Sequence, residues 1–258
     1  MKIVVLLKQT PDTEAKIGID GNQISMTGAS IINPYDEFAI EEALQVKSKN
    51  AGSEVVICSV GPADTKERIL KGLAMGADRG LLVDNTGLES TDSLGISKIL
   101  AAVLKDEGAS LVFCGKQGID DDNMHVGTMT AELLNWPSVN VVNSFELNGD
   151  TAKIEREVEG GQVEVYESAL PIIIGANKAL NQPRYASLPG IMKAKRKPFD
   201  SRTIADFGLD ASALAPKTEV ASFDFPPEKP QGKLFKDKPV EEMVGEVVQL
   251  LKEEAKVL

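Results

Sequence analysis

The sequence is poor in the residues that metal sites and nucleophilic catalysis need. Its 258 residues include one histidine and two cysteines. Cys58 and Cys114 lie far apart without metal-ligand spacing, and His125 would be the sole imidazole for any Ser-His-Asp or Cys-His arrangement. Both cysteines fall in apolar runs typical of central strands, so we expect buried free thiols and a reducing compartment. The composition therefore predicts no bound metal and gives no support to a catalytic triad.

Long apolar runs are also absent. No stretch approaches the roughly 18 consecutive apolar residues that a membrane-spanning helix needs. The chain enters a strand pattern at once, from Lys2 to Lys8, without a signal-peptide cleavage region or the arginine-rich character of a transit peptide. We therefore expect a cytoplasmic protein of bacterial type with no membrane span.

Positive charge is in the minority. The sequence has 28 basic and 39 acidic side chains, which gives a formal charge of −11. Non-specific binding to nucleic acid needs a dominant basic field, so we expect no nucleic-acid partner. One local run of cations, at residues 193–197, departs from this balance.

The first 142 residues alternate between strand and helix patterns. Runs rich in Val, Ile and Leu suit parallel strands buried on both faces, and they fall at 3–7, 55–60, 81–83, 111–114 and 139–142. Helical patterns lie between them; the first begins at Asn33-Pro34 with Asn33 as the expected N-cap, and the others cover about 65–75, 91–107 and 123–134. This alternation predicts an α/β fold with three layers, in which an open, mostly parallel sheet lies between helices.

Two other patterns interrupt the alternation. Asp20-Gly21 separates two short alternating runs and favours a type I′ hairpin turn. Between Ser144 and Ser168 apolar and polar residues alternate, which predicts a β-meander insertion with one polar face. Residues 171–175 then return to the pattern of a buried strand.

The composition changes near residue 195. Residues 195–239 hold six of the 13 prolines together with isolated phenylalanines, and 239–258 have the apolar spacing of an amphipathic helix. We predict a nucleotide-binding α/β domain over 1–194 and, over 195–258, an extended arm that ends in a helix. The helix packs either on its own domain or on a partner.

The candidate nucleotide site is the loop at residues 115–127, which follows a buried strand. It has neither a Gly-x-Gly-x-x-Gly fingerprint nor a P-loop, but it leads into a helix whose free N–H groups can hold a phosphate, with Lys116 to balance charge. Asp120, Asp121 and Asp122 leave three interpretations open: a metal site, a helix cap or solvated loop, and a loop whose backbone contacts a nucleotide. Consecutive side chains diverge, which disfavours the metal, and three carboxylates favour a monophosphate over a triphosphate.

A candidate docking segment spans residues 183–197. Leu188 lies between prolines, and four cations follow it at Lys193, Lys195, Arg196 and Lys197. One apolar anchor beside charges that steer encounter is typical of a protein-docking element. The alternative is an ordinary amphipathic helix that is capped by Ser187 and turns Ile191 and Met192 inward.

Four stretches, in order, resemble the beta subunit of electron transfer flavoprotein. They are Gly-Leu-Ala-Met-Gly-Ala-Asp-Arg-Gly at 72–80, Gly-Lys-Gln-Gly-Ile-Asp-Asp-Asp-Asn-Met-His-Val-Gly at 115–127, Ile-Glu-Arg-Glu-Val-Glu-Gly-Gly at 154–161, and the docking segment. The resemblance covers residues 1 to about 200, with a weaker match in the tail. It implies a Rossmann-like fold that binds an adenine nucleotide, and an electron carrier rather than an enzyme.

The resemblance implies that this chain binds AMP as a structural nucleotide, while the alpha subunit holds most of FAD near the interface. The implied contacts are Leu6, Asn33, Pro34, Tyr35, Asp36, Val60, Lys116, Gln117, Gly118, Ile119, Asp120, Asp121, Asp122, Asn123, Met124, His125, Val126 and Gly127. Tyr35 would approach the flavin, and Thr13 stands where some relatives carry a second aromatic residue. In an alternative, electron-bifurcating branch, a second FAD takes the AMP slot; Gly-Lys-Gln with three aspartates, and Leu188-Pro189, match the AMP branch instead.

The resemblance also implies the partners. The chain would form a heterodimer with the alpha subunit, embraced by the carboxy-terminal arm. It would accept electrons from flavin dehydrogenases, such as the acyl-CoA dehydrogenases of fatty acid oxidation, and pass them to a quinone oxidoreductase. The residues implied in docking are Tyr185, Leu188, Pro189, Ile191, Met192, Lys193, Lys195, Arg196 and Lys197.

Two other classes share the predicted architecture. An adenylating or nucleotide-hydrolysing enzyme would need a phosphate loop such as Ser-Gly-Gly-x-Asp after the first strand, where Lys8-Gln9-Thr10-Pro11-Asp12 stands instead. A nucleotide sensor of stress-response type would lack the basic segment and the long aromatic arm.

Overall fold

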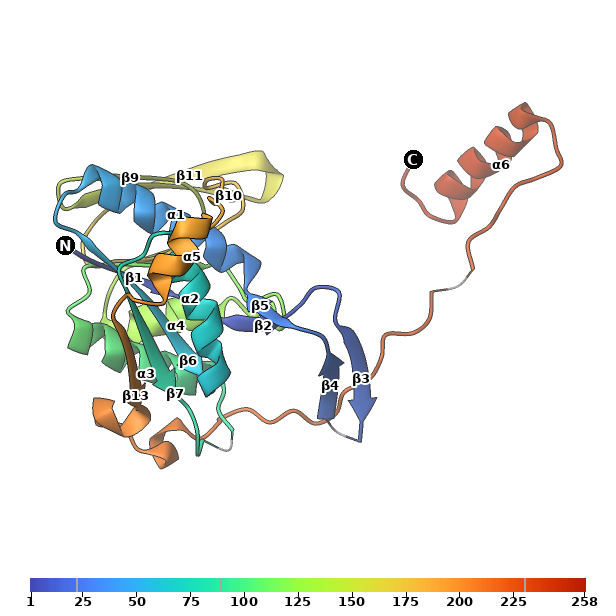
Figure 1. Ribbon diagram of the computed structural model, residues 1–258. Helices are drawn as coiled ribbons and strands as arrows, with labels where there is room; N and C mark the ends of the chain where they lie inside the picture. Colours follow the sequence, from blue (N-terminus) through green and yellow to red (C-terminus); the bar gives the residue numbers. More distant parts are fainter. Residues whose placement is uncertain (22, 89, 230) are drawn as a thin grey trace. The chain divides into compact units, whose positions relative to one another are not determined.

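The computed structural model describes residues 1–21, 23–88, 90–229 and 231–258 and divides the chain into two compact units, Met1–Ala221 and Ser222–Leu258. The first unit is built on a nine-stranded sheet in the order β11-β10-β9-β12-β8-β1-β6-β7-β13 (Figure 1). Its strands are β1 (Lys2–Leu6), β6 (Glu54–Gly61), β7 (Arg79–Asp84), β8 (Leu111–Gly115), β9 (Ser138–Asn148), β10 (Thr151–Val158), β11 (Gln162–Ala169), β12 (Ile172–Ala176) and β13 (Phe199–Thr203). Two small ladders join β2 (Gln9–Pro11) to β5 (Ser30–Ile32) and β3 (Lys16–Asp20) to β4 (Gln23–Thr27).

Helices cover both faces of this sheet. They are α1 (Pro34–Lys49), α2 (Lys66–Met75), α3 (Ser93–Glu107), α4 (His125–Leu134) and α5 (Leu188–Ala194), with 3-10 turns η1 (Ala63–Thr65), η2 (Glu159–Gly161), η3 (Ile204–Phe207) and η4 (Ala211–Leu214). Side chains alternate along a strand. Ile3 and Val5 therefore join the core under α1 and α2, whereas Val4 and Leu6 join the core under α3 and α4. The predicted three-layer fold is confirmed.

The sheet has its switch in strand order at β1. All pairs from β9 through β12, β8, β1, β6 and β7 to β13 are parallel. The chain moves outward from β1 to β6 and β7, and then crosses back to β8 on the other side of β1. Open α/β sheets bind ligands beyond the carboxyl ends of the strands at such a switch. The loops after β1 and β8 therefore frame the expected site.

The predicted β-meander is present as β9, β10 and β11, which pair antiparallel. β9 also contains the separately predicted run at 139–142, because one long strand pairs with both β12 and β10. Val141 has φ +63°, and the register shifts on both sides of the strand near this residue. The irregularity lets β9 serve a parallel and an antiparallel neighbour.

The predicted hairpin near Asp20-Gly21 is present as β3 and β4, but Asp20 pairs with Gln23. Asp20 is thus the last residue of β3 rather than a turn residue, and Gly21 follows it with φ +60°. Residue 22 lies outside the described residues.

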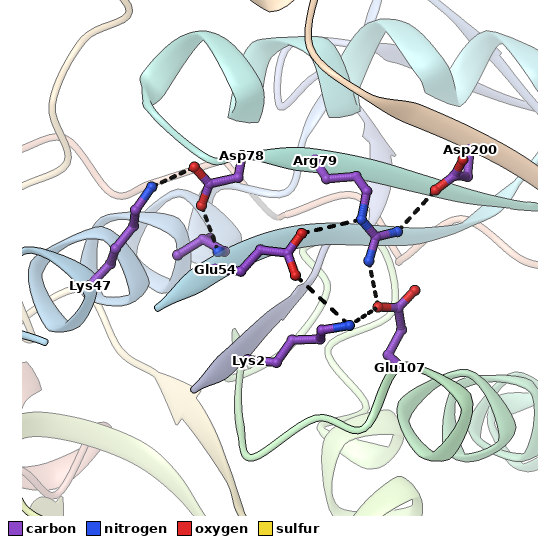
Figure 2. A network of polar contacts seen from close by, with 8 residues as sticks. Lys2, Lys47, Glu54, Asp78, Arg79, Glu107 and Asp200 are labelled. Atoms are coloured by element: carbon purple, nitrogen blue, oxygen red, sulfur yellow. Dashed lines mark hydrogen bonds and ion pairs between the residues drawn. The ribbon is translucent and has the colours of Figure 1, made fainter. Parts of the chain in front are cut away.

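Charged side chains close the amino edge of the sheet (Figure 2). Arg79, at the start of β7, donates to Glu107 at the end of α3 and to Asp200 in β13, the latter at 3.0 Å. Lys2 lies between Glu107 and Glu54, at 3.1 and 3.8 Å. These five residues, Lys2, Glu54, Arg79, Glu107 and Asp200, are called the amino-edge network below.

The carboxy-terminal region differs from the predicted arm. Residues 199–203 form β13, which pairs with β7, and Leu214 is fully buried against α3, so the first unit continues to Ala221 rather than ending at residue 194. The predicted helix is confirmed as α6 (Val240–Glu253) in the second unit. Phe235 lies over the apolar side of α6 with Val247, Leu250 and Leu251. In the described part of the chain, no helix is both long and apolar enough to cross a membrane.

Candidate functional site

Asp36 ties together the two loops at the switch in strand order. Its Oδ2 accepts a hydrogen bond from the Lys8 backbone N–H at 2.7 Å, and its Oδ1 accepts one from the Gly115 N–H at 2.8 Å. A Cβ added to Gly115 would lie 2.4 Å from Asp36 Oδ1, so only glycine allows this approach. Burial raises the pKa of Asp36 to about 7, against the opposing effect of these hydrogen bonds and one from Asn33. Asp36 is therefore a buried clamp on the loops that follow β1 and β8.

Asn33 holds the second loop from beneath. The backbone begins α1 as predicted, but the Asn33 side chain makes no capping bond to α1. Its Nδ2 donates to the Gln117 carbonyl at 2.9 Å and its Oδ1 accepts from the Ile119 N–H at 3.2 Å. Asn33 is therefore the N-cap residue of α1, as predicted, but its side chain does not cap the helix. The Gln117 carbonyl and the Ile119 N–H bind the side-chain amide instead.

Lys8 is a site residue that the sequence reasoning missed. It follows β1, and its Nζ lies 2.7 Å from Asp120 Oδ1 and 3.0 Å from Asp121 Oδ2. Burial lowers the pKa of Lys8, but hydrogen bonds and attraction from both aspartates outweigh it, so the net shift is upward. The signal available in the sequence was a cation directly after the first strand, together with three consecutive aspartates in the loop after another strand of the same sheet.

The three aspartates do not cap α4. The helix begins at His125, and no side chain in the described ranges caps it. Asp122 and Met124 have φ of +51° and +56°, and this left-handed path separates the carboxylates from the helix start. Asp121 Oδ1 accepts instead from the Asn123 N–H at 3.2 Å, and Asp122 accepts from the Gln117 amide. The capping interpretation is therefore wrong, and the first N–H groups of α4 are left without a side-chain acceptor.

The remaining predicted residues surround this loop. Leu6 is buried at the end of β1, and the neighbouring strand β6 carries half-buried Val60. Lys116 Nζ lies 5.0 Å from the centre of the Tyr35 ring. Pro34 opens α1, Gly118 is half-buried in the loop, and Val126 and Gly127 belong to the first turn of α4. A small cavity is lined by Gly115, Lys116, Met124 and Gly127 of the predicted loop. It is also lined by residues that the sequence reasoning did not select: Cys114, Thr128, Ser138, Val139, Asn140, Ile173 and Gly175.

These features suit the binding of one phosphate group. An uncapped helix N-terminus binds phosphate through free N–H groups, and half-buried Val60 offers apolar surface on the strand next to β1. Lys8 is already engaged by two carboxylates, which limits the positive charge left for further phosphates. Among the described residues, no group of three His, Cys, Asp or Glu side chains is arranged to hold a metal ion.

The docking segment forms helix α5 with exposed apolar side chains. Ser187 Oγ accepts from the Gly190 N–H at 3.1 Å, so the predicted cap is present. Ile191 and Met192 are 44% and 62% exposed, and the alternative in which they turn inward is therefore wrong. Tyr185 and Leu188 are 98% and 76% exposed.

Lys197 does not belong to the exposed basic patch. Its Nζ donates to the carbonyls of Leu73 and Ala77 at the end of α2, at 2.9 and 2.5 Å. Burial lowers the pKa of Lys197, and the neighbouring cations Lys47 and Lys193 act in the same direction, against the attraction of Asp78. Lys193, Lys195 and Arg196 remain exposed.

The fold and the site together define a Rossmann-like α/β protein with its candidate nucleotide slot at the switch in strand order. Comparison with known proteins narrows the class. The electron transfer flavoprotein domain matches residues 22–207. The chain is 41% identical over 260 residues to electron transfer flavoprotein subunit beta of Bacillus subtilis (strain 168), with both chains fully covered. It is 38% identical over 237 residues to the human protein of the same name, covering 90% of this chain and 91% of the human one.

The chain therefore belongs to the electron transfer flavoprotein family. The sequence-based recognition of this family is confirmed.

Proposed function

We propose that this chain is the beta subunit of a heterodimeric electron transfer flavoprotein with one AMP bound at the switch in strand order. The observation that carries the proposal is the uncapped N-terminus of α4, which follows the loop that carries Lys116 and is held by Lys8. In the same proposal the alpha subunit holds most of FAD, flavin dehydrogenases such as acyl-CoA dehydrogenases donate electrons, and a quinone oxidoreductase accepts them. The names of the relatives, each a subunit beta, support a second subunit.

FAD supplies the electron-transfer chemistry, and the protein supplies position and electrostatics. In this chain Tyr35 and Lys116 lie together at the carboxyl edge, and Lys116 stacks over the ring of Tyr35. We propose that this pair lies near the flavin edge, where a half-buried cation and an aromatic ring bound the slot. No side chain of this chain is assigned a proton-transfer role.

The exposed face of the docking segment supports a role in partner binding. Tyr185, Leu188 and Met192 are large apolar side chains left in solvent, and three exposed cations lie beside them. Buried apolar anchors dominate the energetics of protein interfaces, while rim charges chiefly raise the association rate. Leu188 is the proposed anchor and Lys193, Lys195 and Arg196 the proposed steering charges.

The test is the nucleotide content of the heterodimer purified with its alpha subunit, measured by denaturation and chromatography. One FAD and one AMP per heterodimer is the expected result. Two FAD and no AMP would overturn the proposal and replace it with the electron-bifurcating branch. A heterodimer with FAD but neither AMP nor a second FAD would remove the nucleotide slot from the proposal.

A further inference from the structure

We infer that Arg184 and Glu41 form a positioning pair that holds the docking segment in its binding conformation before a partner arrives. The inference rests on the proposed docking function of the segment. It concerns a half-exposed arginine directly before Tyr185 and the buried carboxylate on α1 that holds it.

The pair has unusually good geometry for an ion pair at a surface. Arg184 Nε donates to Glu41 Oε2 at 2.7 Å, and a terminal guanidinium nitrogen donates to Oε1 at 2.8 Å. The Arg184 backbone N–H also donates to Oε2 at 3.2 Å. The Glu41 side chain is 6% exposed, on α1, and burial raises its pKa, but the contacts with Arg184 reverse this so that the net shift is downward. Bidentate pairs with one buried partner are the exception among surface ion pairs, most of which contribute little.

A second contact fixes the approach to Arg184. Asn181 Nδ2 donates to the Phe38 carbonyl at 3.0 Å and to Glu42 Oε2 at 2.9 Å, both on α1. The far end of the segment is held on α2, where Lys197 caps the last carbonyls and Gly190 passes so close to the Ala74 carbonyl that a Cβ would lie 2.5 Å from it. The segment is thus attached to α1 on one side and to α2 on the other.

The attachments do not serve to bury the apolar tip. Tyr185, directly after Arg184, is 98% exposed, and Leu188 is 76% exposed. Within the segment, the small side chains of Ala186 and Ala194 pack against the core. Without the polar attachments, these two small contacts would have to order the stretch, and a partner would have to complete the ordering on binding. Ordering a loop beforehand improves affinity by lowering that cost. The geometry therefore assigns to Arg184 and Glu41 an effect on partner binding that exceeds their effect on stability.

The experiment uses the complete flavin-loaded heterodimer and a purified acyl-CoA dehydrogenase, with the heterodimer as the varied substrate. Arg184→Lys keeps the charge but loses the planar fork, and Glu41→Gln keeps the size but loses the charge. Arg202→Lys is the matched control, because Arg202 pairs with Asp106 away from the docking segment. We expect Arg184→Lys and Glu41→Gln to raise KM roughly fivefold with kcat unchanged, and Arg202→Lys to change neither.

Two further measurements separate positioning from structure. Hydrogen exchange of residues 181–192 should speed up in Arg184→Lys while the rest of the chain is unaltered. In the Arg184→Lys/Leu188→Ala double variant, KM should be no higher than in Leu188→Ala alone, because the pair acts through the anchor. Faster exchange with an unchanged KM, or additive effects in the double variant, would overturn the inference. An unchanged KM in Leu188→Ala would instead overturn the proposed docking function.

Discussion

At the amino edge of the sheet, the cations Lys2 and Arg79 pair with three carboxylates, those of Glu54, Glu107 and Asp200, in one network (Figure 2). At the carboxyl edge, Lys8 faces two aspartates, and the first N–H groups of α4 have no side-chain acceptor. Both edges bring charged residues from distant parts of the chain to the ends of parallel strands. They differ in what is left unpaired.

We therefore expect the amino edge to contribute mainly to the stability of the fold and the carboxyl edge mainly to ligand binding. The amino-edge network gains its energy within the folded chain, and its buried member is Glu107, so losing the main partner of Glu107 leaves a buried charge behind. An open edge leaves polar groups whose best partner is a ligand, so losing one member should change binding more than folding.

Arg79→Met should destabilise the chain by about 3 kcal/mol, because it leaves the carboxylate of Glu107, whose side chain is 8% exposed, without its main partner. Urea unfolding monitored by circular dichroism measures the change. The matched variant Asp200→Asn removes a member that is 53% exposed and should cost less than about 1 kcal/mol. Equal effects of the two variants, or loss of nucleotide in Arg79→Met, would contradict the division between the edges.

Asp36→Asn should cost about 2 kcal/mol at pH 5, since an amide nitrogen would replace the oxygen that accepts the Lys8 N–H. The effect should also depend on pH. Burial raises the pKa of Asp36 to about 7, from about 3.9 in an unfolded chain, so between these values the native state binds more protons. The stability of the natural protein should therefore fall as pH rises from about 4 to about 7.

The Asn variant lacks this titration, so the gap between the two unfolding free energies should narrow as the pH rises from 5 to 7 and then stay constant. Urea unfolding at several pH values measures it. Glu37 and Glu42, whose pKa values are also raised by burial, are common to both proteins and cancel in the difference. Parallel stability curves would show that Asp36 is ionised at little cost.

The features that the sequence predicted correctly have strong local signals. Buried parallel strands read as apolar runs, and Gly76, with φ +142°, ends α2 where the pattern stopped. β13 was missed because an edge strand is mostly exposed; Phe-Asp-Ser-Arg-Thr has no apolar run, and its pairing with β7 spans more than 100 residues.

The candidate site shows the same limit. The loop at 115–127 could be chosen from its position after a strand, but the contacts of its side chains depend on distant elements. Asn33 is the N-cap residue of α1, but its side chain hydrogen-bonds the backbone of Gln117 and Ile119 instead of the helix. Lys197 was assigned to a basic patch because spacing shows charge and not the nearby carbonyls of α2. Hydrogen-bond competition across the fold decides these cases.

Lys8→Met should weaken AMP binding about tenfold, because three aspartates would then stand beside the phosphate with one cation fewer. Stability should change by less than about 1 kcal/mol, since the Lys8 side chain is 43% exposed. Equilibrium dialysis with labelled AMP measures binding, and Lys8→Arg is the control that keeps the charge. Undiminished AMP binding in Lys8→Met would mean that the carboxyl edge does not depend on this cation.

Asp92→Ser should have the smallest effect on folding and a local effect on the chain that follows β13. Asp92 caps α3 through Oδ1, which accepts from the Gly95 N–H at 3.0 Å, and holds the tail through Oδ2, which accepts from the Lys217 N–H at 2.6 Å. Serine keeps one oxygen for the cap and loses the second bond, so stability should change by less than about 1 kcal/mol.

The second bond is one of three that fasten residues 213–217 to α3, with Thr91 donating to the Leu214 carbonyl at 3.1 Å and Lys98 to the Ala213 carbonyl at 2.7 Å. Tryptic cleavage after Lys217 requires this stretch to open locally, and its rate should rise about fivefold in Asp92→Ser. Cleavage after Lys233, in the second unit, is the internal control and should not change. The carboxylate of Asp92 accepts hydrogen bonds from backbone N–H groups of the chain itself, whereas the N-terminus of α4 has no side-chain acceptor in the described ranges. We therefore expect Asp92 to hold the tail and not a ligand. An unchanged cleavage rate would show that the apolar burial of Leu214 alone secures residues 213–217.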